Sequence, residues 1–336
     1  MTQNHTPFFH LDPDCILNAI ESIGLRTDGR LLALNSYENR VYQVGIEDAQ
    51  PVVVKLYRPQ RWSDQQILEE HAFVQELAEA EIPVVAPTII NNQTLLHFEQ
   101  QDADFRFSVF RKQGGRTPEL DRTGNMEWIG RFIARIHAIG ALKPFEQRPS
   151  IDIETFGVEP SQFLLTHDFI PQELHEVYRG VVSQALEGVE RCYDRAGDVA
   201  NIRLHGDCHM GNVLWTDDGP HFVDFDDSRS GPAIQDIWML FSGERSEMLA
   251  QLNEFLLGYE DFYDFDTREL YLVEALRTLR LIHYAAWIAR RWEDPAFPVA
   301  FPWFNTQRYW QDRILELREQ IALMDEPALI VASGNR

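Results

Sequence analysis

The chain has 336 residues, 44% hydrophobic and 12% aromatic, which is enough for a packed core in one large domain or two lobes. Its 53 acidic and 30 basic residues give a net charge of −23, which argues against a protein that binds a nucleic-acid backbone. The N-terminus lacks a signal-peptide pattern and no run approaches the roughly twenty apolar residues that span a bilayer, so we expect a cytoplasmic protein without a membrane partner.

The N-terminal third of the chain predicts helix, strands, helix and strands, in that order. Asp12 and Pro13 form an N-cap and first-turn proline, and the apolar stripe behind them ends at Gly24. Ser63 and Gln66 form a capping box that opens the second helix. The predicted strands are residues 31–34, 41–44, 52–56, 94–98 and 105–110.

Beyond a glycine-bearing break at 111–116 the periodicity becomes helical. An apolar stripe from Trp128 to Ile139 predicts one helix, and a hairpin at 202–226 interrupts those that follow. Further helices are predicted at 171–195, from Pro232, and at 245–258, 267–291 and 306–322, with a proline-broken connection at 294–303. This order indicates an α+β chain with a β-rich N-lobe (1–110), a hinge (111–116) and a mainly helical C-lobe (117–336).

One motif carries most of the chemical information. Residues 205–212 read His-Gly-Asp-Cys-His-Met-Gly-Asn, and a hairpin then leads to a hydrophobic strand that ends at Asp224. Phosphoryl transfer by a kinase fold needs a carboxylate near the attacking hydroxyl, and an amide oxygen with a second carboxylate on Mg²⁺. We therefore predict Asp207 as catalytic base, Asn212 and Asp224 as Mg²⁺ ligands, and a catalytic role for Asp224 at the β- and γ-phosphates.

This arrangement resembles the aminoglycoside-phosphotransferase and choline-kinase branch of the two-lobed protein-kinase-like fold. The resemblance implies that Asp207 orients the acceptor hydroxyl and that Asp236 pins the catalytic loop through backbone hydrogen bonds. It also implies ATP as the phosphoryl donor. Between Asp227 and Asp236 there is no room for a long activation segment, so control by phosphorylation of such a segment is not expected.

Three upstream residues are candidates for binding the nucleotide. Lys55, in a strand of valines, matches the lysine that holds the α- and β-phosphates in kinases. Glu70 is its expected helix partner, and Glu69 is the alternative because an error of one residue changes the helix face. Ser36 lies in a glycine-poor loop expected to cover the phosphates through its hydroxyl and backbone N–H groups.

The residues around the motif have less specific interpretations. His205 is expected to support the loop as a buried histidine, and His209 to brace it. Asp226 is either a structural carboxylate or a contact for a second Mg²⁺. Cys208 is interpreted as an inert packed thiol, with oxidation sensitivity as the alternative. The three cysteines contain no C-x-x-C pair, so neither a zinc site nor a disulfide framework is indicated.

Longer blocks of sequence resemble a narrower family. The blocks are residues 35–42, 55–59, 66–71 and 290–298, and they resemble the bacterial stress response kinase A family over nearly the full length. The resemblance implies an ATP- and Mg²⁺-dependent serine/threonine protein kinase that acts in envelope and oxidative stress responses.

The residues by themselves leave the acceptor open. Phosphoryl transfer to a hydroxyl also fits a small-molecule kinase of the choline, homoserine or aminoglycoside type, and a nucleotide-binding pseudokinase scaffold is a third possibility. We expect a monomer that binds ATP and either a protein with a Ser or Thr acceptor or a small alcohol. The helix around Arg277 and Arg280, with the 295–303 connection, is expected to form the acceptor side.

Overall fold

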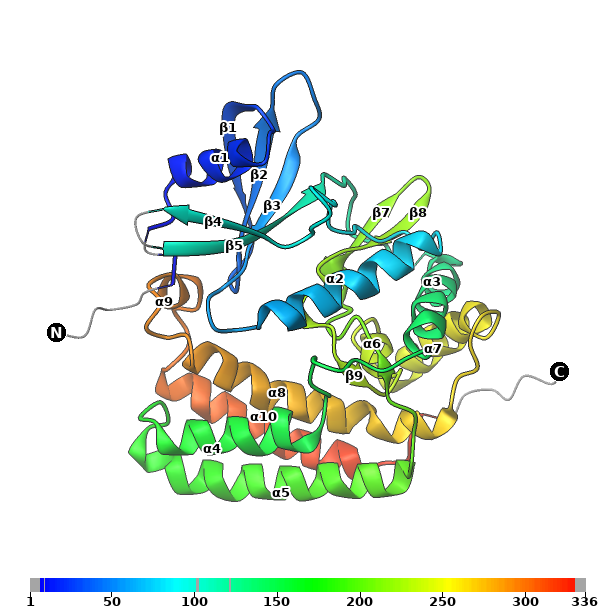
Figure 1. Ribbon diagram of the computed structural model, residues 1–336. Coiled ribbons are helices and arrows are strands. Elements are labelled where there is room, and N and C mark those ends of the chain that lie inside the picture. Colours follow the sequence, from blue (N-terminus) through cyan, green and yellow to red (C-terminus); the bar gives the residue numbers. More distant parts are fainter. Residues whose placement is uncertain (1–6, 9, 101–102, 121, 330–336) are drawn as a thin grey trace. The chain divides into compact units, whose positions relative to one another are not determined.

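A computed structural model describes residues 7–8, 10–100, 103–120 and 122–329, which form two compact units (Figure 1). The first unit consists of Met1–Thr117 and Val213–Asp226, and the second of Pro118–Asn212 and Asp227–Arg336. Residues 1–6, 9, 101–102, 121 and 330–336 of the predicted lobes lie outside the described residues. The predicted hinge at 111–116 stays a prediction.

The first unit is built on a five-stranded antiparallel sheet with strand order β1-β2-β3-β5-β4. Its strands are β1 (Thr27–Leu34), β2 (Arg40–Ile46), β3 (Val52–Leu56), β4 (Leu96–Gln100) and β5 (Ala103–Arg111). One face packs against α1 (Pro13–Ser22), where Ile16 and Ile20 are buried together with Val54 and Leu56. Because strand side chains alternate, Lys55 points to the opposite face from this core.

Both predicted helix starts in this unit are present with their caps. Asp12 Oδ1 accepts a hydrogen bond from Cys15 N at 2.7 Å at the start of α1. In α2 (Asp64–Glu79), Ser63 Oγ accepts from Gln66 N and Gln66 Oε1 accepts from Ser63 N, which completes the capping box. Such caps typically contribute about 1 kcal/mol each and fix where the helix begins.

The hairpin of β7 (Val213–Thr216) and β8 (Gly219–Phe222) belongs to the first unit although it lies far along the chain. Bridges join Arg116 to Trp215 and Val84 to Phe222. Gly115 passes so close to Leu214 that a Cβ at this position would overlap its side chain. The chain thus brings Asp224, which follows β8, to the unit that carries Lys55.

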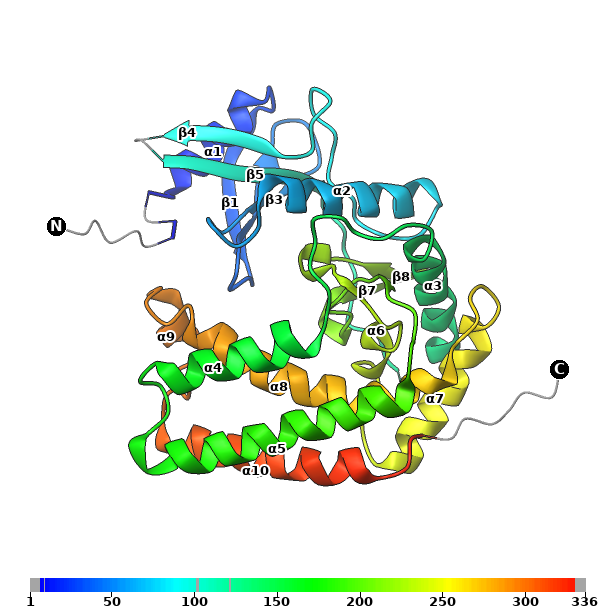
Figure 2. The same cartoon turned by 60° about the horizontal axis from the view of Figure 1, so that its bottom comes forward.

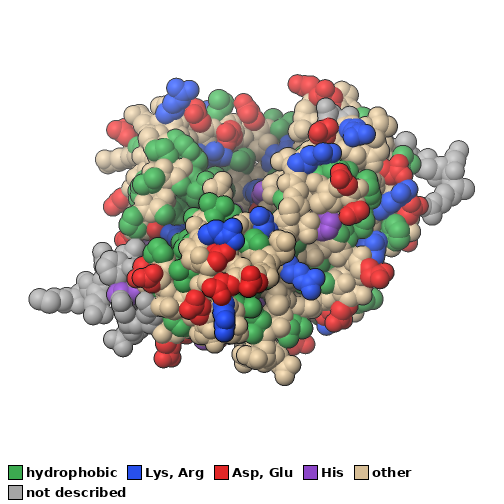
Figure 3. Space-filling model, turned by 90° about the horizontal axis from the view of Figure 1, so that it is seen from above, with side chains coloured by type: hydrophobic (Ala, Val, Ile, Leu, Met, Phe, Trp, Pro, Cys, Tyr) green, Lys and Arg blue, Asp and Glu red, His purple; other side chains and the backbone are tan. Residues whose placement is uncertain are grey.

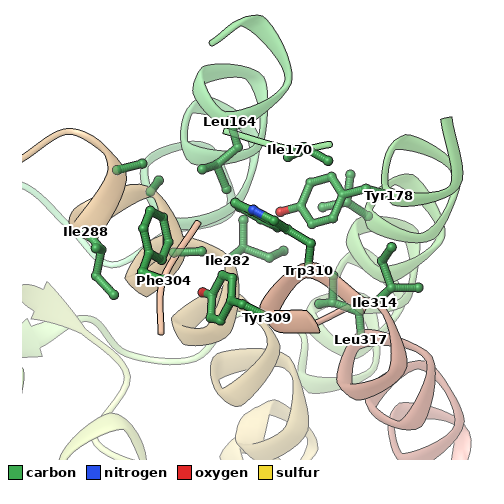
Figure 4. Packing of buried hydrophobic residues seen from close by; sticks show 14 of the residues in the cluster. Leu164, Ile170, Tyr178, Ile282, Ile288, Phe304, Tyr309, Trp310, Ile314 and Leu317 are labelled. Atoms are coloured by element: carbon green, nitrogen blue, oxygen red, sulfur yellow. The ribbon is translucent and has the colours of Figure 1, made fainter. Parts of the chain in front are cut away.

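The second unit is mainly helical, and α5 (Gln172–Ala196), α8 (Val273–Ala289) and α10 (Gln307–Asp325) lie side by side in it (Figures 1 and 2). At their shared core, the indole of Trp310 lies against Tyr178, Leu164 and Ile282 (Figure 4). The long helices are α3 (Asn125–Gly140), α5 (Gln172–Ala196), α7 (Arg245–Tyr259), α8 (Val273–Ala289) and α10 (Gln307–Asp325). This apolar core holds α8 in place and thereby positions the polar side chains along it.

Several predicted boundaries in this unit are wrong. The helix predicted at 267–291 begins as a 3₁₀ turn (Thr267–Leu272) before α8, and the helix predicted from Pro232 is only α6 (Gln235–Trp238). A π turn (Glu154–Val158), α4 (Glu159–Thr166) and α9 (Ala296–Ala300) were not predicted. Such short elements contain too few turns for a periodic apolar stripe to stand out.

The face seen in Figure 3 has acidic and basic side chains scattered over it, without a broad basic area. This distribution matches a chain with a net charge of −23. Among the helices of the described residues, none combines the length and apolar character needed to cross a bilayer.

The glutamate that supports α6 leads to a prediction about stability. Burial raises the pKa of Glu269 to about 7, and the Ile234 N–H, which donates to Glu269 Oε2 at 2.8 Å, offsets only part of this effect. The folded protein therefore holds this proton more tightly than the unfolded chain, so the contribution of Glu269 to stability falls as pH rises from about 4.5 to 7. We expect Glu269→Gln to be more stable than the wild type at pH 8, by up to about 3 kcal/mol, and similar to it at pH 5.

Urea unfolding at the two pH values measures this difference. Glu187→Gln, at an exposed position of α5 (Gln172–Ala196), is the matched control, and its stability should equal that of the wild type at both pH values. A Glu269→Gln variant whose stability also follows the wild type at both pH values would contradict the prediction.

Candidate active site

The catalytic-loop motif lies in the second unit, directly after the short strand β6 (Ile202–Arg203), which pairs with β9 (Ser230–Gly231). Gly206 has φ +86°, and a Cβ there would overlap the carbonyl oxygen of Asp227. Only glycine fits this combination of a left-handed backbone and a close approach. The glycine before Asp207 therefore sets the turn from which the aspartate projects.

Asp236 holds this turn in place. Its Oδ2 accepts from His205 N and its Oδ1 from Gly206 N, both at 2.8 Å, and His137 Nε2 lies 3.2 Å from Oδ2. The carboxylate is buried, and hydrogen bonds of this charge-assisted kind are stronger than neutral ones. These are the backbone hydrogen bonds that the resemblance implied for Asp236.

Asp207 itself is half-buried and faces two cationic or donor groups. Arg280 Nη1 donates to its Oδ1 at 2.6 Å, and His209 Nε2 lies 3.5 Å from its Oδ2. Burial alone would raise the pKa of Asp207, but His209 and Arg280 outweigh that effect and hold the pKa below its usual range. The side chain is thus an ionised carboxylate, able to accept a hydrogen bond from a hydroxyl.

Asn212 is joined to the same loop by its amide nitrogen. Its Nδ2 donates to the carbonyl oxygen of Asp207 at 2.9 Å. This assignment of the amide leaves Oδ1 as the atom suited to a cation, since Mg²⁺ takes oxygen ligands.

In the first unit, Lys55 and Asp224 form an ion pair. Lys55 Nζ donates to Asp224 Oδ1 at 2.7 Å and lies 3.6 Å from Asp226 Oδ1. The Lys55 side chain is only 9% exposed, whereas that of Asp224 is 55% exposed. Asp224 has φ 62°, a left-handed conformation that aspartate tolerates better than most residues. The pair therefore joins a buried cation to a carboxylate open to solvent.

Charge around Lys55 favours its protonated form. Burial by itself would lower the pKa of Lys55, but Asp224, Asp226 and Glu70 together hold the pKa well above its ordinary value. Glu70 is on the buried face of α2 and Glu69 is less buried, so the structure favours Glu70 over Glu69 as the residue near Lys55. The hydrogen bond of Lys55 is to Asp224, whereas Asp226 and Glu70 add negative charge near its ammonium group.

Ser36 closes the tip of its loop. Its Oγ donates to the carbonyl oxygen of Asn39 at 3.0 Å. Asn39 Oδ1 in turn accepts from Arg58 N at 3.0 Å, which ties the loop to the end of β3. With its O–H donated to Asn39, Ser36 shapes the loop, and the backbone N–H groups of the loop are the donors that remain for a phosphate.

Two arginines that the sequence did not single out connect the loop of Ser36 to Asp226. Arg58 Nε lies 3.0 Å from Glu38 Oε1, and Arg61 pairs with Asp226 while its Nε lies 3.8 Å from Glu38 Oε2. Glu38, Arg58, Arg61 and Asp226 are all largely buried. Asp226 is therefore held within this network, which supports the structural interpretation of the two that the sequence left open.

We expect Arg61→Met to lower the free energy of unfolding by about 3–5 kcal/mol, because it removes the cation that pairs with the buried carboxylate of Asp226. Arg30→Met removes a partner of Asp28 in an exposed pair, with the Arg30 side chain 78% exposed, and should lower stability much less than Arg61→Met. Chemical denaturation of both variants measures the difference. Equal losses in the two would show that the buried network is no stronger than a surface pair.

The cysteine beside Asp207 is buried. Burial, followed by the charges of Asp236 and Asp207, raises the pKa of the Cys208 thiol well above its usual value. A thiol that stays protonated is a poor nucleophile, which favours the inert interpretation over oxidation sensitivity.

Comparisons with known proteins place the chain in a family. The sequence signature of the phosphotransferase enzyme family matches residues 30–273. Stress response kinase A of Salmonella choleraesuis (strain SC-B67) is 44% identical over 329 residues, which cover 98% of each chain. A relative in Salmonella typhimurium (strain LT2), named serine/threonine protein kinase RdoA, has the same identity and coverage.

Solved structures with a similar fold are more distant in sequence. The amicoumacin kinase hAmiN, in complex with AMP-PNP, Ca²⁺ and Ami, has a TM-score of 0.72 at 18% identity, over 95% of each chain. A microcompartment-associated aminopropanol kinase has a TM-score of 0.70 at 16% identity, over 94% of this chain and 97% of its own.

Fold and sequence signature together define a phosphotransferase with the two-lobed α+β protein-kinase-like fold, which confirms the predicted fold class. The chain belongs to the phosphotransferase enzyme family and, within it, to the stress response kinase A proteins. The resemblance drawn from residues 35–42, 55–59, 66–71 and 290–298 is thereby confirmed.

Proposed function

We propose that this protein transfers the γ-phosphoryl group of Mg-ATP to a serine or threonine hydroxyl of a protein during a bacterial stress response. The observation that carries the proposal is the 44% identity, over 98% of both chains, with the relative named serine/threonine protein kinase RdoA. The names of the other relatives supply the stress response.

Each candidate residue has a role in this proposal. Asp207 accepts a hydrogen bond from the acceptor hydroxyl and orients it for attack on the γ-phosphorus. Lys55 holds the α- and β-phosphates, Glu70 supports Lys55 electrostatically, and Ser36 covers the phosphates. All of these contributions are positioning and charge, which is what phosphoryl transfer mostly requires.

The oxygen donors suit a magnesium ion. We assign Asn212 and Asp224 as its protein ligands, with Asp224 also acting in catalysis at the β- and γ-phosphates. The described residues hold no cluster of three or more His, Cys, Asp or Glu side chains placed to bind a metal by themselves. A small set of protein oxygens is nevertheless usual for Mg²⁺, which keeps waters and phosphate oxygens as ligands and neutralises charge on the phosphates.

A small-molecule kinase is the second candidate, because the structural neighbours named above include kinases of amicoumacin and aminopropanol. Identities of 16–18% support the shared fold and not a shared acceptor. A pseudokinase scaffold is less consistent with the chain, since Lys55, Asp207, Asn212 and Asp224 are all present. We further propose a monomer that acts in the cytoplasm, where ATP is available.

An acceptor panel tests the proposal. Purified protein is incubated with γ-labelled ATP and Mg²⁺, and transfer is followed to a generic protein substrate, choline, homoserine and an aminoglycoside. Label on serine or threonine of the protein is the expected result. Transfer only to a small alcohol would replace the proposal by the second candidate, and ATP binding without transfer to any acceptor would favour the scaffold.

A further inference from the structure

The carboxylate of Asp207 has a partner at each oxygen. Arg280, on α8, occupies Oδ1, and His209 faces Oδ2. Gly211 N donates to His209 Nδ1 at 2.9 Å, so in a neutral imidazole the proton is on Nε2, the nitrogen that faces Asp207. An acceptor hydroxyl that binds Asp207 therefore arrives beside groups that already donate to it.

Arg280 differs from the arginine one turn before it on α8. Arg277 Nη1 lies 3.1 and 3.0 Å from the two carboxylate oxygens of Glu274, and its guanidinium stacks over Trp238 at 5.4 Å. Arg280 has Asp207 as its ion-pair partner among the residues that the structure describes, and its side chain is 40% exposed. Arg277 is thus engaged by its own helix, whereas Arg280 is engaged by the catalytic loop.

A guanidinium carries five N–H donors in a planar fork, and the bond to Asp207 uses one nitrogen. The Arg280 side chain is 40% exposed, and its bond to Asp207 holds the guanidinium beside the carboxylate to which we assign the acceptor hydroxyl. Arg280 donates one hydrogen bond to Asp207, and the acceptor hydroxyl donates another to the same carboxylate. These two bonds in series place the substituents of the hydroxyl within about 6 Å of the guanidinium. Carboxylate and phosphate groups match the fork best, and a cationic group there is repelled.

We propose that Arg280 selects acceptors that carry an anionic group beside the reacting hydroxyl, which in a protein means an aspartate or glutamate next to the serine or threonine. Arg280 is then a specificity-determining residue of the acceptor site. The inference rests on the proposed function, because it needs the acceptor at Asp207. It sets this protein apart from kinases of amino alcohols and aminoglycosides, whose acceptors are cationic. The chain as a whole carries a net charge of −23, so attraction of an acidic acceptor has to be local.

Binding of matched peptides tests this inference without requiring turnover. Each of two fluorescent peptides contains one serine. In the first peptide aspartate flanks the serine on both sides, and in the second peptide asparagine does. Fluorescence anisotropy measures their affinity for the wild type, Arg280→Gln, Arg280→Lys and Arg277→Gln in the presence of AMP-PNP and Mg²⁺. Melting temperatures of all variants report on folding, and the affinity for the nucleotide reports on the rest of the site.

We expect the wild type to bind the aspartate peptide at least tenfold more tightly than the asparagine peptide. Arg280→Gln should abolish this preference, Arg280→Lys should retain part of it, and Arg277→Gln should keep it, with nucleotide affinity unchanged in all four. Equal affinity for the two peptides in the wild type, or a preference that survives in Arg280→Gln, would overturn the inference, as would binding of neither peptide.

Turnover of the same peptides separates this inference from the proposed function. Preferential binding of the aspartate peptide without phosphorylation would support the role of Arg280 and contradict protein kinase activity. Phosphorylation of both peptides with equal efficiency would support protein kinase activity and overturn the role of Arg280.

Discussion

Asp207→Asn is expected to lower the rate of phosphoryl transfer by on the order of 10²–10⁴-fold while the affinity for Mg-ATP stays nearly unchanged. The amide keeps the size of the side chain and an oxygen for Arg280, but it lacks the negative charge that holds and activates the acceptor hydroxyl. The nucleotide and metal are assigned to other residues. Steady-state transfer to the best acceptor, with a separate titration of nucleotide, measures the two quantities.

The control for this variant is Cys208→Ser, at the next residue of the loop, which keeps the carboxylate and should retain most of the transfer. Substantial transfer by Asp207→Asn would remove Asp207 from the proposed machinery. A parallel loss of nucleotide affinity and melting temperature would instead show that the substitution disrupts the loop.

The second large effect is expected for Asp224→Ala. It removes the exposed carboxylate that we assign to the metal, and it leaves Lys55 without the partner 2.7 Å away. We expect the affinity for Mg-ATP to fall by at least about tenfold, the cost of one charge-assisted contact. Affinity for ATP without Mg²⁺ should not fall, because removal of an aspartate also removes repulsion of the phosphates. Calorimetric titration with and without Mg²⁺ measures these two affinities.

Asn212→Ala provides a graded comparison. It removes a neutral oxygen ligand, so its loss of Mg²⁺-dependent affinity should be smaller than that of Asp224→Ala. If both variants bind Mg-ATP like the wild type, neither residue is a metal ligand.

Local signals made much of the framework predictable. The caps at Asp12 and at Ser63 with Gln66 act within three residues, so the sequence indicates them directly, and the structure contains both. The spacing of Asp207 and Asn212 is likewise a property of one tight loop. Their hydrogen bond at 2.9 Å lies within six consecutive residues, so the spacing in the sequence indicates it.

Long-range pairs were not predictable in the same way. Arg61 meets Asp226 across 165 positions, and Arg280 meets Asp207 across 73. Neither arginine stands in a spacing that indicates its partner, because these contacts depend on how separate elements pack. The sequence placed Arg277 and Arg280 together on the acceptor side, whereas the structure shows Arg277 paired with Glu274.

The aromatic residues near the end of α8 illustrate the same limit. The 295–303 connection, which contains Phe297, Phe301 and Trp303, was expected to form part of the acceptor side. In the structure Phe297 and Phe301 are buried and Trp287 packs against their core cluster, while Trp303 is exposed. A sequence shows that aromatic side chains are near arginines, but not which of them are used to fill a core.

The central claim is transfer of the γ-phosphoryl group to a protein hydroxyl by a machinery that includes Asp207. The most direct measurement is phosphoamino-acid analysis of a protein substrate after incubation with γ-labelled ATP and Mg²⁺, using wild type and Asp207→Asn in parallel. We predict label on serine or threonine with the wild type, none when Mg²⁺ is chelated, and little with the variant. Label that forms equally with wild type and variant, or that never appears on a protein hydroxyl, would contradict the account.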